Sequence, residues 1–349
     1  MSCIPQLWSH SIAWLSGYLT PVLSFLHVRD DPHQVAEAVM ITTVQISVIA
    51  LIFRPLENIV PAERWVDRRL TKIDRLYTLL VLLGLLPLLS YVVLSPLSIF
   101  LEHRGAIGEA TFGVKRWIPW FDHHPLLLIA AYYLAYDFVY YWMHRAQHLI
   151  PWLWALHSLH HSQRQMSCWT NDRDSYLSGA LEAMVLACVG LIMGVDIVNF
   201  AWLALASELI QNFSHTNVRI GFGRLLAKIF VDPRFHRLHH MKADPARPAL
   251  HNCNFGQAFS IWDVMFGTAL YGEPVRPTGV GDPIIDADNE RGLIAMQWHA
   301  LKRFWGAFRR PSGWRPGDVT FGPRYEPIHN DVVHEESHIT VRCRLALWR

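Results

Sequence analysis

Long apolar stretches constrain the fold of this chain more than any other feature of its sequence. Residues 76–101 contain no charged side chain, and a helix of about 20 apolar residues is long enough to cross the hydrocarbon core of a bilayer. A stretch of this length is hard to accommodate as a core helix of a soluble protein. We therefore expect residues 76–101 to span a membrane.

Further stretches extend this interpretation. Residues 35–53 and 126–142 each carry a single acidic side chain, and residues 177–213 are long enough for a helical hairpin that crosses the bilayer fully or in part. Residues 11–26 are a weaker candidate, interrupted by Pro21, that could lie at the interface. The sequence thus predicts an all-α protein with four to five membrane segments.

Composition excludes several other classes of protein. Hydrophobic residues make up 52% of the 349 residues and charged residues 17%, against about 25% charged in a typical soluble domain. Global disorder is excluded because there is ample apolar surface to bury, and a net charge of +2 argues against a nucleic-acid partner. The five cysteines lack CxxC spacing, and their odd number argues against a disulfide framework.

The distribution of Lys and Arg predicts the orientation in the membrane. If the loop 54–75 is cytoplasmic, most of the 31 basic residues fall on the cytoplasmic side, and only Arg29, Arg104, Lys115 and Arg116 fall on the other. Residues 1–10 have no basic region typical of a cleaved signal peptide. We expect a multi-pass protein of a bacterial inner membrane or of the endoplasmic reticulum, with its functional site on the cytoplasmic side.

Three sets of histidines follow the third apolar stretch. Residues three and four apart share one face of a helix, so each set is expected to direct its imidazoles to a common point. The hairpin returns the third set to the same side of the membrane as the first two, and eight imidazoles gathered in this way predict a polynuclear metal site. The sets are His144 and His148; His157, His160 and His161; and His236, His239 and His240.

The absence of Glu and Cys from the histidine sets narrows the choice of metal. The first set has no Glu between its histidines, as a zinc peptidase would require, and structural zinc sites usually include Cys. Haem in a membrane bundle takes axial histidine pairs rather than sets of three. Imidazole suits Fe, Zn and Cu, and eight or nine such ligands suggest two ions with open positions.

At these residues the sequence resembles the fatty acid hydroxylase / sterol desaturase superfamily of integral-membrane, non-haem di-iron enzymes. The resemblance covers about residues 126–270. It rests on DFVYYWMHRAQH (137–148), HSLHHS (157–162), HTN (215–217), PRFHRLHH (233–240) and NFGQAFSIWDVMFGT (254–268). It implies a membrane anchor, a cytoplasmic histidine-rich helical cap with two irons, and O2-dependent hydroxylation or desaturation of a lipid.

The resemblance also implies roles for individual residues. The eight histidines above become iron ligands, and His215 becomes a ninth. Independently of the resemblance, Asp137 is the one acid in residues 126–142 and shares a helix face with His144. We expect its carboxylate to accept a hydrogen bond from a ligand imidazole; the alternative is a helix-packing carboxylate paired with Arg. Asn254 either bonds a ligand histidine or iron-bound water, or is a plain turn residue. His251 has no spacing that ties it to the ligands.

The absence of two cofactor-binding motifs bears on the source of the electrons that this interpretation requires. Neither a GxGxxG fingerprint after a strand nor an HPGG element of a fused cytochrome is present. Electrons must therefore come from a separate ferredoxin or cytochrome. The substrate is expected to be a fatty acyl chain, a sterol-like isoprenoid, or an ether lipid or aminolipid.

The domain division follows from these segments. We expect an N-terminal segment at 1–34, membrane anchor helices at 35–125 and the catalytic domain at 126–270. A cytoplasmic tail at 271–349 is expected to contain an interfacial amphipathic helix near 298–310. Two other functions stay open from the sequence: a metal-binding or transport protein without redox chemistry, and an inactive scaffold of the same superfamily.

Overall fold

The computed structural model describes residues 3–25, 31–65, 70–80, 114–193, 197–242 and 252–309. Within these ranges the chain is helical and forms no strand, apart from two isolated bridges, Pro61 with Val218 and Met241 with Thr278. The prediction of an all-α fold is therefore confirmed.

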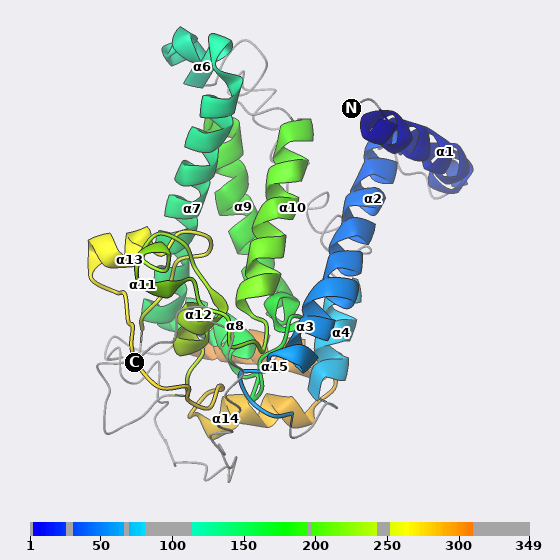
Figure 1. Cartoon of the computed structure of the whole chain (residues 1–349). Coiled ribbons are helices and arrows are strands. Elements are labelled where there is room, and N and C mark those ends of the chain that lie inside the picture. The colour runs from blue at the N-terminus through cyan, green and yellow to red at the C-terminus, as the bar shows by residue number, and fades with distance from the viewer. Residues whose placement is uncertain are drawn as a thin grey trace.

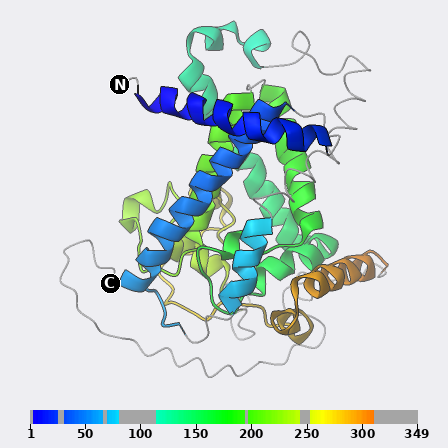
Figure 2. The same cartoon turned by 90° about the vertical axis from the view of Figure 1, so that its right-hand side faces the viewer.

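Four long helices run roughly side by side and define the long axis of the molecule (Figure 1). One is continuous from Pro32 to Ile59 and is divided into α2, a π-helical turn η1 and α3; the others are α7, α9 and α10. Figure 2 shows α1 lying across one end of this bundle. The bounds are α1 Cys3–Phe25, α2 Pro32–Val48, η1 Ile49–Phe53, α3 Arg54–Ile59, α7 Pro125–Leu149, α9 Tyr176–Met193 and α10 Ile197–Ser214.

Shorter helices gather at the opposite end of the bundle from α1 (Figure 1). There α8 packs along α15, and α4 lies against the turn η4. These elements are α4 Leu70–Leu80, α8 Pro151–His161, η4 Thr170–Asp172, α11 Gly223–Leu226, α12 Pro233–His239, α13 Ile261–Phe266, α14 Pro283–Asp286, η6 Ala287–Glu290 and α15 Leu293–Phe308; α6 Val114–Trp117 and η3 Pro119–His123 precede α7.

Proline residues set the boundaries that matter most for the site. Pro151 cannot continue α7, because it has no backbone N–H and disfavours a helical residue before it. Ile150 is extended, and α8 starts anew at Pro151 in the helix position that tolerates proline best. The chain therefore turns sharply between the histidines of α7 and those of α8.

Two of the described helices, Pro32–Ile59 and Pro125–Leu149, are long and apolar enough to cross a bilayer. Helices α9 and α10 cover the region of the expected hairpin, with residues 194–196 between them outside the described residues. Of the expected span 76–101, α4 covers the first residues and the rest lies outside the described residues. The expected number of four to five membrane segments thus stays a prediction.

The helix expected near residues 298–310 is present as α15. One stripe of this helix, Ile294, Trp298, Trp305 and Phe308, is exposed, while Met296 and Ala300 are buried. Its amphipathic character is clear, but its position at a membrane interface stays a prediction.

Candidate metal centre

Nine buried histidines form two neighbouring groups at the end of the bundle that carries α8 and α12. None of the nine is more than 7% exposed. Within each group, ligand-type nitrogens lie within 4.8 Å of one another. The first group is His144, His148, His157, His161 and His239; the second is His160, His215, His236 and His240.

Helical geometry divides two of the sequence sets between the groups. On α8, His157 and His161 are four apart and join the first group, whereas His160 joins the second. At α12 the pair that is four apart, His236 and His240, joins the second group and the remaining histidine joins the first. The expectation that each set points at one common point is therefore wrong for these two sets, because a third imidazole on the same face still diverges enough to reach a neighbouring point.

The second group converges on a single point through its Nε2 atoms. The Nε2 of His215 lies 3.1 Å from that of His160 and 2.9 Å from that of His236. Metal–imidazole bonds of about 2.0–2.1 Å, as in zinc sites, place adjacent ligand atoms about 3 Å apart. The spacing of these three nitrogens therefore fits a shared metal ion.

Unpaired nitrogens show that the histidines also fit a metal chemically. The Nε2 atoms of His144, His148, His161, His239 and His240 are buried and lack a hydrogen-bond partner among the described residues. Leaving buried polar atoms unpaired costs free energy. A metal ion bound to these lone pairs would remove that cost.

Backbone carbonyls hold four of the rings by their other nitrogen. The Nδ1 of His160 is 3.1 Å from the oxygen of Arg173, and that of His215 is 2.8 Å from the oxygen of Gln211. A carbonyl can only accept, so Nδ1 carries the proton and the Nε2 lone pair stays free. His144 and His239 are held in the same way, by Phe255 and Cys253.

Burial keeps six of the imidazoles uncharged. Desolvation disfavours the imidazolium form and lowers the pKa of His239 to about 3 and that of His215 to about 4. It also lowers the pKa of His160, His161, His236 and His240 well below the usual value. At neutral pH these six imidazoles are therefore uncharged, so each keeps one ring nitrogen with a free lone pair.

Asn254 sits in a turn between two of the carbonyls that hold histidines. Its φ of 59° is in the left-handed region, which Asn tolerates better than most residues. Its side chain donates to the oxygens of Phe235 at 2.8 Å and Leu270 at 3.1 Å and accepts from the Leu270 N–H at 2.7 Å. Of the two alternatives from the sequence, the structure favours the turn residue, since the side chain bonds backbone rather than a histidine.

Asp263 holds the same turn and was missed by the sequence analysis. One carboxylate oxygen accepts from the Phe255 N–H at 2.8 Å and the Thr268 hydroxyl at 2.6 Å, and the other accepts from the Gly256 N–H at 2.8 Å. A Cβ on Gly256 would lie 2.5 Å from the oxygen of Phe259, so only glycine fits there. The available signal was an acidic residue within the apolar run IWDVMF.

Asp137 does not have the partner that the sequence predicted. Its carboxylate accepts from the N–H groups of Ala258 at 2.9 Å and Phe259 at 3.2 Å, and from the indole N–H of Trp262 at 2.8 Å. The expected hydrogen bond to a ligand imidazole is therefore replaced by bonds to the loop before α13. Helical spacing placed Asp137 on the histidine face but could not show which distant segment packs there.

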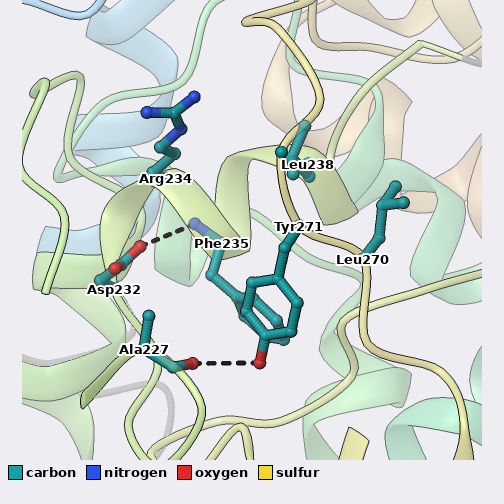
Figure 3. Close-up of a pocket in the computed structure, with 8 residues that line it drawn as sticks. Ala227, Asp232, Arg234, Phe235, Leu238, Leu270 and Tyr271 are labelled. Atoms are coloured by element: carbon teal, nitrogen blue, oxygen red, sulfur yellow. Dashed lines mark hydrogen bonds between the residues drawn. The ribbon is translucent and has the colours of Figure 1, made fainter. Parts of the chain in front are cut away.

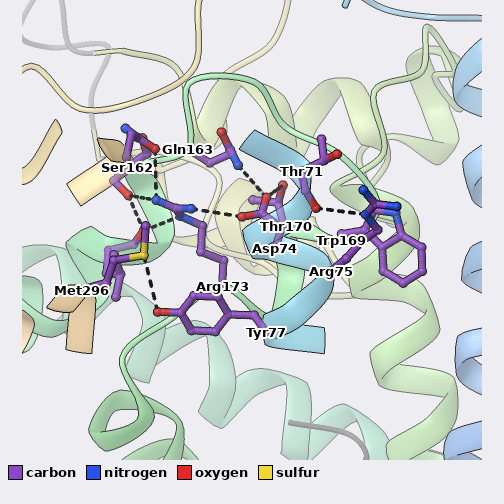
Figure 4. Close-up of polar contacts among 12 residues, drawn as sticks. Thr71, Asp74, Arg75, Tyr77, Ser162, Gln163, Trp169, Thr170, Arg173 and Met296 are labelled. Carbon is purple, nitrogen blue, oxygen red and sulfur yellow. Dashed lines mark hydrogen bonds and ion pairs between the residues drawn. The ribbon is translucent and has the colours of Figure 1, made fainter. Parts of the chain in front are cut away.

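Arg173 and Asp74 form a buried ion pair (Figure 4). The Arg173 guanidinium pairs with Asp74 of α4 at 3.1 Å and donates to the Ser162 hydroxyl at 2.9 Å and to Asn289 at 3.0 Å. Arg173 is also the residue whose carbonyl accepts from His160. This network fixes the backbone that orients a histidine of the second group.

A small pocket lies against α12 and is lined by no histidine (Figure 3). The Tyr271 hydroxyl closes it by donating to the oxygen of Ala227 at 3.1 Å, and Asp232 caps α12 by accepting from the Phe235 N–H at 2.8 Å. His251, the remaining histidine considered from the sequence, lies outside the described residues.

The chain is similar to several proteins whose names describe lipid monooxygenases or hydroxylases. The chain is 32% identical to alkylglycerol monooxygenase of Caenorhabditis elegans over 167 residues, which cover 47% of this chain and 31% of that protein. It is 29% identical to the ornithine lipid hydroxylase OlsE of Rhizobium tropici over 178 residues, 51% of each protein. Human alkylglycerol monooxygenase is 29% identical over 218 residues, 59% of this chain and 46% of that protein.

The chain thus spans about a third to a half of the length of these relatives. No solved structure matches it. Residues 129–268 match the family described as Fatty acid hydroxylase, and this range contains all nine histidines of the two groups. These matches support a relationship between residues 129–268, the part of the chain that holds the site, and the fatty acid hydroxylase superfamily.

Proposed function

We propose that this protein is an O2-dependent membrane oxidoreductase that uses two non-haem iron ions to hydroxylate a C–H bond of a lipid. The observation that carries the proposal is the sorting of nine buried histidines into groups of five and four. Neither group contains a cysteine or a carboxylate, and imidazole is a ligand that suits iron.

Each group would hold one iron ion. The rings of His161 and His240, which belong to different groups, are stacked with centroids 4.3 Å apart, so the two sites are neighbours. Bound iron would supply the activation of O2 that attack on an unactivated C–H bond requires and that amino-acid side chains lack.

The protein's own residues prepare the ligands before any metal binds. Burial keeps the imidazoles of His160 and His240 neutral, and the carbonyls of Phe255, Cys253, Arg173 and Gln211 hold the Nδ1 protons of four of the rings so that their Nε2 atoms are available. Burial also excludes bulk water from the ligand atoms. These features would reduce the rearrangement needed on binding iron.

The relatives favour hydroxylation over desaturation and a polar lipid as the substrate. Their names describe a monooxygenase of alkylglycerols and a hydroxylase of ornithine lipid, so we propose an ether lipid or an aminolipid. Helices α2–α3 and α7 would anchor the protein in the membrane, with the histidine groups on the cytoplasmic side. Electrons would come from a separate ferredoxin or cytochrome.

The experiment that tests this function is lipid analysis of cells that express the full chain under isotopically heavy O2. Hydroxylation is expected to add one heavy oxygen atom to a membrane lipid, whereas loss of two hydrogens without label would indicate desaturation. The His160→Ala variant should form neither product. The matched control is His123→Ala, which removes an exposed histidine outside both groups; iron-loaded protein that changes no lipid would contradict the proposal.

A further inference from the structure

Two elements outside the long helices present exposed apolar side chains beside α7. Helix α13 exposes Val264, Met265 and Phe266, and residues 219–231, which include α11, expose Leu225, Leu226, Ile229 and Phe230. Leu225 is 80% exposed and Met265 63% exposed. We call these seven side chains the apolar ridge; Figure 1 shows both elements at the level of the lower half of α7.

The contacts of α13 with α7 define the depth of the part of the ridge that α13 contributes. Phe138 packs against Trp262 with ring centroids 5.1 Å apart, and Trp142 packs against Phe266 at 4.9 Å. Helix α7 has 25 residues, so it is about 37 Å long, and these contacts lie about 20 to 26 Å from its start. Because a bilayer core is about 30 Å thick, they fall inside the core wherever a spanning α7 is centred.

Backbone N–H groups at this depth are paired within the protein, as a position within a bilayer demands. The loop from 258 to 260 is not helical, and its N–H groups at Ala258 and Phe259 donate to the buried carboxylate of Asp137. The backbone of the 219–231 segment is joined to the same loop, since the Val231 N–H donates to the oxygen of Ala258 at 2.9 Å. A carboxylate within an apolar helix is explained if it lets this loop lie at membrane depth.

The positive charges of the 219–231 segment are complementary to an anionic lipid surface. Arg219, Arg224 and Lys228 are all exposed, and the segment contains no acidic residue. Basic side chains interleaved with exposed apolar ones are typical of elements that lie in the interface of an anionic membrane.

We propose that the apolar ridge is embedded in the bilayer leaflet next to the metal centre, with Arg219, Arg224 and Lys228 at anionic lipid headgroups. The occupant of this surface is thus the lipid bilayer, and the domain that carries the histidines sits partly within it. This inference rests on the membrane-spanning position of α7 proposed above. It places a lipid-embedded surface directly before α12, so a lipid chain could approach the centre without leaving the membrane.

Depth-dependent fluorescence quenching tests the proposal on the full chain. In a background with Cys3, Cys188 and Cys343 changed to Ser, a nitrobenzoxadiazole probe is attached at Leu225→Cys or Met265→Cys in nanodiscs containing phosphatidylglycerol. Nitroxide groups on the lipid acyl chains are expected to lower the fluorescence of both probes roughly two-fold or more, as for residues inserted into the acyl boundary. Aqueous iodide should leave both nearly unquenched.

Two matched positions separate this inference from the membrane proposal. A probe at Leu134→Cys, an exposed site on α7, should be quenched by the lipid nitroxides, and one at Ile284→Cys, an equally apolar exposed site on α14, should be quenched by iodide alone. If the probe at 134 is quenched by the lipid nitroxides but the probes at 225 and 265 are quenched by iodide, the proposal of an embedded ridge is overturned, while the membrane position of α7 is retained. Protection of 225 and 265 from both quenchers would mean that protein covers the ridge, and failure at 134 would overturn the membrane position of α7 itself.

A separate variant tests whether the basic side chains help to hold the ridge in the membrane. Changing Arg224 and Lys228 together to Glu should reduce lipid quenching of the probe at 225 and leave the probe at 134 unchanged. Equal quenching at 225 with and without these changes would remove anionic headgroups from the proposal.

Discussion

The Nδ1 of His144 lies 2.9 Å from the carbonyl oxygen of Phe255, a residue 111 positions further along the chain. Two residues before Phe255, the carbonyl of Cys253 accepts from His239 at 2.7 Å. One short turn thus orients two histidines of the five-histidine group from different helices. The residues that hold this turn should control metal binding without touching a metal.

The first prediction concerns Asp263, whose carboxylate holds the N–H groups of Phe255 and Gly256. Asp263→Asn removes one acceptor and should lower metal affinity about 10- to 100-fold, as loss of groups behind metal ligands commonly does. Titration of metal-depleted protein with Co(II), followed by its visible spectrum, measures this. Asp288→Asn, a change at a buried acid that pairs with Arg291 and Arg303, is the control; equal affinities in the two variants would contradict the role of Asp263.

The second prediction separates the contribution of the backbone conformation of Asn254 to metal binding from that of its side-chain hydrogen bonds. Asn254→Gly loses three hydrogen bonds but keeps a left-handed φ at little cost, whereas Asn254→Ala also strains the backbone by about 1–2 kcal/mol. We expect both variants to bind less metal than the wild-type protein and the alanine variant to bind less than the glycine variant. Metal content after purification at matched temperature checks the order, and a reversed order would show that the turn is not the important feature.

The third prediction tests the division of the α8 histidines. His160→Ala should remove metal from the four-histidine group, and His157→Ala should remove it from the five-histidine group. Each single variant should therefore retain about one of the two ions of a two-metal site. The double variant should retain neither. Metal analysis and membrane insertion measured on the same preparations check this, and loss of both ions from either single variant would indicate one shared site.

The fourth prediction concerns the buried ion pair of Asp74 and Arg173. Asp74→Asn leaves the buried guanidinium of Arg173 without its charged partner. Loss of one partner of a buried ion pair typically lowers the free energy of unfolding by about 3–5 kcal/mol. Arg173→Met should cost a similar amount, and the double variant should be destabilised by clearly less than the sum. Thermal unfolding in detergent measures all three, and simple additivity would show that the two charges do not interact.

Part of the site could be predicted from the sequence because it depends on local periodicity. Histidines three and four apart must share a helix face, so the sets on α7, α8 and α12 were visible before the fold was known. All nine expected ligands are brought together. Their role as iron ligands stays a proposal.

The residues around the ligands could not be predicted in the same way. Asp137 and the amides that it holds are 121 and 122 positions apart in the chain, and Asp74 is 99 positions from Arg173. No spacing rule reaches over such distances. Asp263 was overlooked for a different reason. Its partners lie only five to eight positions away, but an irregular turn rather than a helix or strand of fixed period brings them to its carboxylate.

The sequence by itself determined that this chain is helical, that it has helices apolar enough for a membrane, and that its histidines face inward from a few helix faces. These properties follow from side-chain hydrophobicity and from the 3.6-residue period of the helix. Only the tertiary structure decided how the histidines divide into five and four, and which backbone carbonyls orient them. That division depends on the directions in which α7, α8, α10 and α12 pack, and packing directions are set by contacts between segments far apart in the chain.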